Sequence, residues 1–425
     1  MERTKSDRIY DIAVVGATGF AGSLVAEYLG EHRGTGQFSL ALAGRSMDRL
    51  ESLRDRLTAS DPGSTVPPPP IVQVDLLDQH SVDALVRKTR VVVAAAGPYS
   101  RYGSLLVASC ASHGTHYVDL SGETPWMQRM IQQHNHEARE NGACIVHACG
   151  YDSIPSDLGV LFLRTVMASD GLDEPEAVRF VPGPTHGGFS GGTVASMLST
   201  FADARKDAAT REALRDPDSL TPDHHPLQRR RRRRHDPWLR TWTVPFVMEA
   251  VNSRVVRRSN ALSGYPLGHD PDYREVISFG SGFSACVKSY AASFGMGLFL
   301  LLLLVPPTRM LLSRTVLPKP GEGPKVARER RGSFIVRMIG YSSTRDSSVP
   351  RGASAGSAHA TTVTVSADRD PGYGATAIMI AESALLLLEL SRNGNACTGF
   401  QTPATAFGMP LVERLTVAGV QFMRE

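Results

Sequence analysis

The chain is poor in cysteine and in the spacings that mark metal or disulfide proteins. Its 425 residues contain five cysteines, none of them in a C-x-x-C pair: Cys110, Cys144, Cys149, Cys286 and Cys397. The odd number and the scattered positions argue against a disulfide framework and a zinc site. No two histidines have the spacing of metal ligands. We therefore expect reduced thiols, no metal and a cytoplasmic location.

Strong charge and an apolar leader are also missing. The first residues, MERTKSDRIYD, contain no apolar stretch, so no signal peptide is expected. The formal net charge of +4 is too small to indicate a nucleic-acid partner. With 42% hydrophobic and 21% charged residues, the composition is that of a globular protein, and the length allows two or three domains.

One apolar run stands out, but it is short. Residues 294–305, FGMGLFLLLLLV, end at Pro306. A helix that crosses a bilayer needs about 20 residues, so a membrane span is not expected. Three interpretations stay open: a buried core helix, an apolar surface that covers or admits a lipid-like substrate, and a helix that dips into a membrane or lipid-droplet surface. Arg309 and Arg314 in the following stretch, which extends the apolar segment to 294–317, suit an interface.

The most informative feature lies at residues 11–22, DIAVVGATGFAG, where an apolar run leads into three glycines. A helix that begins after such a turn binds phosphate through free N–H groups and its dipole. Gly16 permits a tight turn, Gly19 lets the backbone approach a pyrophosphate, and Gly22 lets the helix pack closely. The G-x-x-G-x-x-G spacing departs from the usual fingerprint by one residue, but the flanking strand and helix patterns indicate a dinucleotide site.

The end of the second expected strand indicates which dinucleotide is bound. The sequence there is Ala43-Gly44-Arg45-Ser46, without the acidic residue that holds the ribose of NAD. Arg45 can pair with a 2′-phosphate, and Ser46 can add a hydrogen bond. We therefore predict NADP(H). The alternative is that Arg45 is a solvated residue in the first turn of the next helix.

Residues 8–170 are predicted to form a doubly wound parallel α/β sheet of the Rossmann type, because strand-like and helix-like stretches alternate there. The expected strands are 10–16, 38–44, 71–75, 90–96, 115–119 and 143–148. The expected helices are 20–31, 46–59, 79–88, 101–113, 124–141 and 156–168.

A second, α+β domain is predicted for residues 171–370. Its expected strands are 176–181, 275–289, 333–340 and 360–367, and its expected helix is 193–206. Residues 209–236, which include Arg229–Arg234, are predicted to be a disordered or weakly ordered insertion. If residues 294–317 lie on a membrane, the arginine run would add attraction to anionic lipid. The simpler interpretation is that the run is part of a solvated insertion. Residues 371–425, with helices at 374–391 and 411–418, are expected to return to the first domain.

Chemistry is expected where ligands bind in open α/β sheets, outside the carboxyl ends of the strands. The predicted cofactor-binding residues are Gly16, Thr18, Gly19, Phe20, Gly22, Arg45, Ser46, Ala96, Gly97 and Pro98. Hydride transfer also needs a proton donor near the product anion. Tyr151 is the first candidate for donor or relay, beside Tyr99 and the carboxylates of Asp119 and Asp152. In the competing interpretation, Tyr151 packs at the domain seam.

Two further polar residues of this region have simpler interpretations. Ser153, with Asp152 in the competing interpretation, is expected to cap the helix that follows, and Asp157 lies in the first turn of that helix. His147 lies in an apolar strand and is expected to be a satisfied core residue.

Several segments together resemble the saccharopine dehydrogenase-like oxidoreductase family, in its trans-acting enoyl reductase branch. They are VVGATGFAG at 14–22, LAGRS at 42–46, AAGPYSRYG at 95–103, YVDLSGE at 117–123, GYDSIPSDLG at 150–159, SGGTVAS at 190–196, PKPGEGP at 318–324 and DPGYGATA at 370–377. The resemblance implies an NADP(H)-binding Rossmann domain, a second domain with a mixed sheet and a C-terminal return. The apolar stretch before PKPGEGP favours the lipid branch, and GATGFAG departs from the start expected of saccharopine reductases.

Three functions follow from these observations. The first is an NADPH-dependent reductase of an enoyl or carbonyl group in a lipid or polyketide-like substrate. The second is a saccharopine-type amino-acid dehydrogenase. The third is a non-catalytic NADP(H)-binding protein on membranes or lipid droplets. We expect a small, lipid-like substrate as partner, with a homodimer through the second domain left open.

Overall fold

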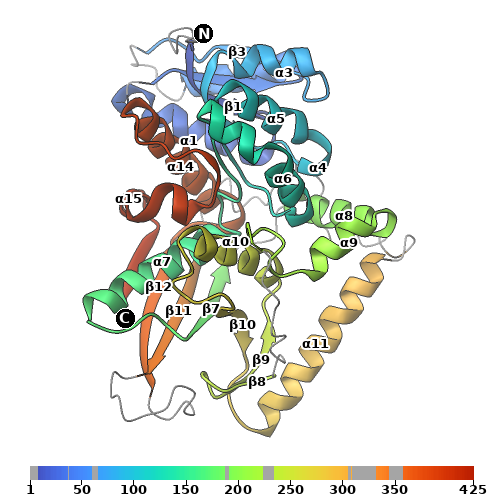
Figure 1. Ribbon diagram of the computed structural model, residues 1–425. Coiled ribbons are helices and arrows are strands. Elements are labelled where there is room, and N and C mark those ends of the chain that lie inside the picture. Colours follow the sequence, from blue (N-terminus) through green and yellow to red (C-terminus); the bar gives the residue numbers. More distant parts are fainter. Residues whose placement is uncertain are drawn as a thin grey trace.

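Two sheets of seven strands each form the framework of the molecule (Figure 1). The computed structural model describes residues 8–36, 38–59, 66–186, 191–223, 234–304, 308, 332–343 and 358–425. In Figure 1 the first sheet and its helices lie above the second sheet, and α10 lies between them.

The first sheet is parallel throughout, which confirms the predicted doubly wound domain. Its strands in spatial order are β13 (Gly399–Gln401), β6 (Cys144–Val146), β5 (His116–Asp119), β4 (Thr89–Ala94), β1 (Tyr10–Val15), β2 (Leu40–Gly44) and β3 (Ile71–Gln73). The connecting helices are α1 (Phe20–Gly36), α2 (Met47–Ala59), α3 (Gln79–Val86), α4 (Tyr99–Tyr102), α5 (Ser104–His113) and α6 (Thr124–Asn141), whereas α7 (Ile154–Ser169) leads from β6 to the second sheet and packs on it.

Both faces of this sheet are buried, as a parallel sheet requires. Side chains alternate along a strand, so Ile12 and Val14 of β1 enter one apolar cluster and Ala13 and Val15 enter another. The first cluster continues into the second domain, where it includes Met338 and other residues of the second sheet. The two domains therefore share one core.

The second sheet is mixed, because β7 and β10 pair in parallel and the other pairs are antiparallel. Its strands in spatial order are β14 (Gln421–Arg424), β12 (Ala358–Ala367), β11 (Ser333–Ser343), β7 (Ala177–His186), β10 (Asp272–Ser278), β9 (Thr241–Pro245) and β8 (His235–Asp236). The helices of this part are α8 (Gly191–Lys206), α9 (Ala208–Arg215), α10 (Glu249–Leu262) and α11 (Phe283–Leu304).

The C-terminal part joins both domains. It contains a π-helical turn, η2 (Pro371–Ala375), followed by α14 (Thr376–Arg392) and α15 (Pro403–Val417). α14 packs on α1 and β4, and β13 extends the first sheet, whereas β14 pairs with β12 of the second sheet. Among the described residues, Pro371–Arg392 is the one helical stretch long and apolar enough to cross a membrane, and 72% of its apolar window is buried inside the protein.

Two predictions in the second domain are wrong. The expected disordered insertion at 209–236 contains helix α9 and strand β8, with turns at 216–223, and residues 224–233 lie outside the described part. The expected strand at 275–289 ends at Ser278, and α11 begins at Phe283. Gly280 and Gly282 have φ values of +88° and +89°, which break the strand between these elements. The sequence also predicts a glycine-rich turn at 186–192, of which residues 187–190 lie outside the described part, and a flexible loop at 345–357, which lies wholly outside it.

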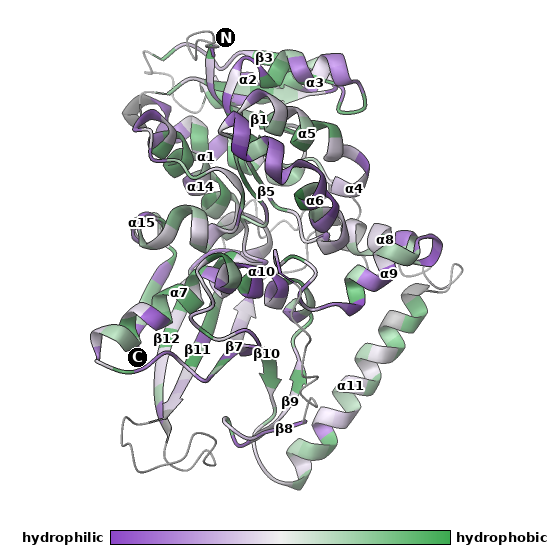
Figure 2. Ribbon diagram, in the orientation of Figure 1, coloured by the Kyte–Doolittle hydropathy of each residue, from purple (hydrophilic) through white to green (hydrophobic). Residues whose placement is uncertain are grey.

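The buried-core interpretation of residues 294–305 is also wrong for its described part. These residues end α11, the long helix at the edge of the molecule in Figure 1. Phe294 is 74% exposed and Leu301 is 56% exposed. Figure 2 shows hydrophobic residues along much of this outlying helix.

Candidate cofactor and active site

The glycine-rich turn between β1 and α1 is as tight as a dinucleotide site requires. Gly16 has a φ of +80°, which favours glycine. A Cβ atom at Gly16 would lie 2.9 Å from the Cβ of Ala96, and one at Gly22 would lie 2.2 Å from the carbonyl oxygen of Gly16. The turn therefore packs against the loop after β4 on one side and against its own helix on the other. These close contacts fit the cradle of a bound dinucleotide.

The connection after β2 offers a cation beside this turn. Arg45 is exposed and lies between the end of β2 and the start of α2 at Met47, so it is not in the first helical turn. Its guanidinium carbon is 5.8 Å from the ring centre of Tyr102 in α4. Among the described residues, no carboxylate pairs with Arg45. An exposed arginine beside an aromatic ring suits an adenine that carries a 2′-phosphate.

The loop after β4 is held by a buried glutamate to which the sequence assigns a place near the site but no role. Glu123, which directly precedes α6, accepts hydrogen bonds from the backbone N–H groups of Tyr99 and Ser100 at 2.7 and 2.9 Å. It also accepts a bond from the hydroxyl of Ser196 in α8 at 2.7 Å. One carboxylate thus caps the start of α4 and fixes α8 against it. The only sequence signal was the position of Glu123 at the end of the YVDLSGE motif.

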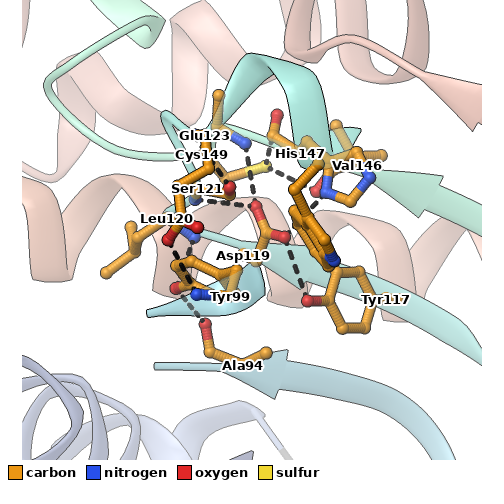
Figure 3. A network of polar contacts seen from close by, with 12 residues as sticks. Ala94, Tyr99, Tyr117, Asp119, Leu120, Ser121, Glu123, Val146, His147 and Cys149 are labelled. Atoms are coloured by element: carbon orange, nitrogen blue, oxygen red, sulfur yellow. Dashed lines mark hydrogen bonds and ion pairs between the residues drawn. The ribbon is translucent and has the colours of Figure 1, made fainter. Parts of the chain in front are cut away.

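A second buried carboxylate, Asp119, joins the ends of β5 and β6 (Figure 3). Its side chain accepts hydrogen bonds from the Tyr117 hydroxyl at 3.0 Å, from the backbone N–H of Ser121 at 2.9 Å and from that of Ala148 at 3.0 Å. His147 Nδ1 lies 2.7 Å from it. Asp119 is fully buried, so its position indicates a structural clamp on the two loops.

His147 departs from the expectation of a satisfied core residue. Its Nδ1 contacts Asp119, but its buried Nε2 has no hydrogen-bond partner in the described part of the chain. The rings of Tyr117, Trp126 and Phe400 surround the imidazole, with centres 5.1 to 5.9 Å from it. This aromatic surround leaves one nitrogen without a polar neighbour.

Tyr99 is placed by the same loops. Its hydroxyl donates to the carbonyl oxygen of Ala94 at 2.9 Å and accepts from the N–H of Leu120 at 3.1 Å (Figure 3). Burial, followed by the charge of Asp119, raises the pKa of Tyr99 well above its usual value. Because both hydrogen-bonding directions of this buried hydroxyl are used by backbone, the geometry gives Tyr99 a positioning role.

The GYDSIPSDLG segment attaches the first domain to the second. Ser153 precedes α7 at the N-cap position, but its side chain does not cap the helix and donates to Asn252 of α10 at 2.9 Å. Ser156 donates to Glu275 of β10 at 2.6 Å. Asp157 accepts from the N–H of Ala404 at 2.8 Å. The expected capping by the Ser153 hydroxyl is therefore wrong: the hydroxyl is engaged with Asn252 of α10, and no backbone N–H group of α7 donates to it.

Tyr151 and Asp152 lie where this segment meets the second sheet. The ring of Tyr151 packs edge-on against Phe334 of β11, with centres 4.7 Å apart. Burial, followed by the charges of Asp152 and Glu275, raises the pKa of the Tyr151 hydroxyl. Burial also raises the pKa of Asp152 to about 6. The seam position foreseen for Tyr151 is thus observed, and its hydroxyl also has a hydrogen bond with the side chain of Thr185 in β7.

The DPGYGATA segment completes the site from the C-terminal part. Tyr373 of η2 packs edge-on against Phe20 at the start of α1, with ring centres 4.4 Å apart. The Thr376 hydroxyl accepts from the N–H of Tyr151 at 3.1 Å. The segments around residues 20, 151 and 373 therefore meet, although they are far apart in the sequence. Within the described residues, no group of three or more histidine, cysteine or acidic side chains is arranged to hold a metal ion.

Known proteins share both the sequence and the fold of this chain. Residues 12–146 match the family model described as the saccharopine dehydrogenase NADP binding domain. A protein of Mycobacterium ulcerans named trans-acting enoyl reductase is 34% identical over 98% of both chains. A Mycobacterium tuberculosis protein, which carries that name provisionally, is 39% identical over 98% of both chains.

The solved structure of apo histidine-tagged saccharopine dehydrogenase (L-Glu forming) from Saccharomyces cerevisiae resembles the whole molecule. The TM-score is 0.54 at 11% identity, and the alignment covers 98% of this chain and 100% of that one. At such low identity the likeness concerns the fold alone.

Proposed function

Because this chain belongs to the saccharopine dehydrogenase-like oxidoreductases, in the branch of the trans-acting enoyl reductases, we propose that it uses NADPH to reduce an enoyl or carbonyl group of a lipid or polyketide-like substrate. The family makes the chain an NADP-dependent oxidoreductase. What we propose beyond the family assignment is that the reduced group is an enoyl or carbonyl group and that the substrate is lipid-like.

The observation that carries this proposal is the surrounding of Tyr151. The charged groups that act on its hydroxyl are the carboxyls of Asp152 and Glu275, and its ring packs on Phe334. Burial raises the pKa of Asp152 to about 6 and that of Glu275 to about 7, so this buried setting disfavours charge and suits a neutral, apolar substrate better than one rich in carboxylates, such as saccharopine. The exposed apolar helix α11 is consistent with a lipid context.

The residues of the site fit a bound NADPH, which supplies a hydride when present. The N–H groups of Gly16 and Gly19 donate to the carbonyl oxygens of Ala43 and Gly16 and so hold the turn in shape. The pyrophosphate would bind at the first turn of α1, and Arg45 would meet the 2′-phosphate.

Tyr151 keeps its proton at neutral pH because its pKa is raised. For an enoyl substrate Tyr151 would donate its proton to the alkene carbon that is bonded to the carbonyl carbon, while the hydride goes to the other alkene carbon. For a carbonyl substrate it would donate the proton to the carbonyl oxygen, while the hydride goes to the carbonyl carbon. Solvent then returns a proton to Tyr151.

The cofactor part is tested by titrating the purified protein with NADPH and NADH, followed by fluorescence. For Arg45→Asp we expect NADPH affinity to fall at least about tenfold, since a charge-assisted pair is lost and a repulsion is gained, while NADH affinity changes little. Arg54→Asp, on α2 and away from the turn, is the matched control. If neither cofactor binds the wild type, the glycine turn is only structural.

The chemical part is tested by NADPH oxidation with enoyl thioesters, carbonyl lipids and saccharopine. Tyr151→Phe should lower kcat by about 100-fold or more without changing NADPH affinity, because it removes a proton donor but no cofactor contact. Turnover of saccharopine alone would favour the amino-acid dehydrogenase. Tight NADPH binding without turnover of any substrate would favour the non-catalytic protein.

A further inference from the structure

The chain leaves the first sheet and returns to it at two cysteines that lie in contact. Cys144 is the first residue of β6, and Cys397 lies two residues before β13, which pairs with β6 and has Gly399 opposite Cys144. The sulfur atoms of Cys144 and Cys397 are 3.1 Å apart, although 253 positions separate the two residues. The stretch of chain between the two thiols contains every strand of the second sheet except β14.

The backbone beside each thiol is held by hydrogen bonds. The N–H of Cys144 donates to Nδ1 of His116 in β5 at 3.1 Å. The N–H of Gly399 donates to the carbonyl oxygen of Ala143 at 2.7 Å. These bonds keep the end of the returning segment next to the start of β6. Since the sulfur atoms of a disulfide are about 2.05 Å apart, an approach of about 1 Å would turn this contact into a bond.

The two thiols differ in exposure and in acidity. Cys144 is fully buried, whereas Cys397 is partly exposed and precedes the exposed Thr398. The hydrogen bond from the Cys144 thiol lowers the pKa of Cys397. The same hydrogen bond, followed by burial, raises the pKa of Cys144 well above its usual value. Because the thiolate is the nucleophile and an oxidant arrives from solvent, Cys397 is the sulfur that reacts first.

We propose that Cys144 and Cys397 are a redox-active pair whose reversible disulfide fastens the C-terminal return to the first sheet. The oxidant is a peroxide. The Cys397 thiolate attacks one oxygen of hydrogen peroxide, the O–O bond breaks, and the products are a sulfenic acid on Cys397 and hydroxide.

The second step closes the disulfide. The sulfur of Cys144 attacks that of Cys397, the S–S bond forms, and the S–O bond breaks. The OH group leaves with the proton of Cys144 as water. Two electrons have then passed from the two sulfur atoms to the peroxide, and a dithiol reductant reverses the change. This chemistry does not depend on the reaction that the protein catalyses.

The disulfide is expected to act on stability and not on the cofactor site. Cys144 lies at the amino end of β6, whereas the glycine turn and Tyr151 follow the carboxyl ends of their strands. A cross-link between residues so far apart in the sequence restricts mainly the unfolded chain. We therefore expect oxidation to raise the resistance to unfolding and to change NADPH affinity by less than about twofold.

The test treats the folded full chain with a small excess of hydrogen peroxide and maps its peptides by mass spectrometry without reduction. We expect the free thiols to fall from five to three per chain. The two peptides that contain Cys144 and Cys397 should be joined and should separate after treatment with dithiothreitol. Cys286→Ser, which removes another partly exposed thiol, is the matched control and should form the same cross-link, whereas Cys397→Ser should not.

The order of the two steps is tested with dimedone, which labels sulfenic acids. In Cys144→Ala, Cys397 should be labelled after peroxide treatment, because no neighbouring thiol resolves its sulfenic acid. In Cys397→Ser, Cys144 should stay unlabelled, because it is fully buried. Circular dichroism checks that each variant is folded, and the mapping of the wild type decides the cross-link by itself if a variant is not.

Urea unfolding measures what the disulfide does. Oxidation should raise the urea midpoint of the wild type and of Cys286→Ser by about 0.5–1 M and leave that of Cys397→Ser unchanged.

Two results would overturn the proposal. One is a folded wild type in which peroxide leaves Cys397 a thiol, or oxidises it to sulfinic acid, without a cross-link to Cys144. The other is a cross-linked protein that unfolds at the same urea concentration as the reduced one, since the disulfide would then not fasten the C-terminal return.

Discussion

Gly22 and Gly30 lie in the same helix, α1, but in different surroundings. A Cβ atom at Gly22 would lie 2.2 Å from the Gly16 carbonyl oxygen, whereas one at Gly30 would make an ordinary contact with Leu57 at 3.4 Å. Gly22→Ala should therefore lower the free energy of unfolding by about 1–3 kcal/mol and weaken NADPH binding, since the turn must shift. Urea unfolding and NADPH titration measure both effects.

Gly30→Ala is the matched control for this prediction. Alanine favours a helix over glycine by about 1 kcal/mol, so this variant should be as stable as the wild type or slightly more stable. Equal destabilisation by both substitutions would mean that the turn is not constrained by the packing of Gly22.

The buried carboxyl of Glu275 makes stability depend on pH. Burial raises its pKa from an ordinary 4.5 to about 7, although Ser156, Tyr273 and Asn252 donate hydrogen bonds to it. The folded protein thus binds this proton more tightly than the unfolded chain. Protonation of Glu275 stabilises the folded protein fully below about pH 4.5. As the pH rises to about 7 this contribution is lost, and the free energy of unfolding falls by up to about 3 kcal/mol.

Glu275→Gln should remove this pH dependence. The difference in unfolding free energy between variant and wild type should grow in favour of the variant from pH 4.5 to 7 and stay constant above that, as measured by urea unfolding at each pH. Glu51→Gln, at an exposed position of α2, should give a constant difference. Parallel profiles for Glu275→Gln and wild type would show that Glu275 is ionised at neutral pH.

At the scale of elements, the short helix α4 depends on a carboxylate from elsewhere in the chain. Glu123 accepts the first two N–H groups of α4 and also the hydroxyl of Ser196. In Glu123→Gln the side-chain NH₂ group cannot accept these bonds. We expect a loss of about 1–3 kcal/mol in unfolding free energy and a raised dissociation constant for NADPH, because α4 follows the Gly97-Pro98 loop.

Ser196→Ala separates the two parts of this role. It removes the bond from α8 but leaves both N–H groups of α4 bound to Glu123. We expect about 1 kcal/mol of destabilisation and a smaller effect on NADPH affinity. If Ser196→Ala weakens NADPH binding as much as Glu123→Gln, α8 rather than the capping of α4 holds the loop.

For the whole molecule, one continuous core predicts one cooperative unfolding transition. Trp126 lies in the first domain, and Trp238 and Trp242 lie in the second. In Trp126→Phe the remaining tryptophans report on the second domain, and in Trp238→Phe/Trp242→Phe the remaining Trp126 reports on the first. We expect the two variants to have the same midpoint of urea unfolding, followed by tryptophan fluorescence. Two separate midpoints would show that the shared apolar cluster and the hydrogen bonds of residues 153–157 do not couple the domains.

The sequence determined the first domain almost completely, because its signals are local. An apolar strand, a glycine turn and a helix follow each other directly, so β1, Gly16 and α1 could be predicted from neighbouring residues. The absence of an acid after β2 is a local signal of the same kind, and it indicates NADP(H). In the second domain β9 and α10 were not predicted, and the strand expected at 275–289 passes into α11. The burial of these segments depends on partners that are distant in the sequence.

Tertiary structure alone decided which residues meet. Cys144 and Cys397 are 253 positions apart, yet their sulfur atoms lie 3.1 Å from each other because β13 pairs with β6. The same return brings Tyr373 onto Phe20. Composition made residues 294–305 suitable for a core or a surface, and only the tertiary structure shows that α11 is buried at Ala285 and Ser289 and leaves this later part exposed. Local sequence sets the preference of each segment, whereas burial depends on surfaces that the rest of the chain supplies.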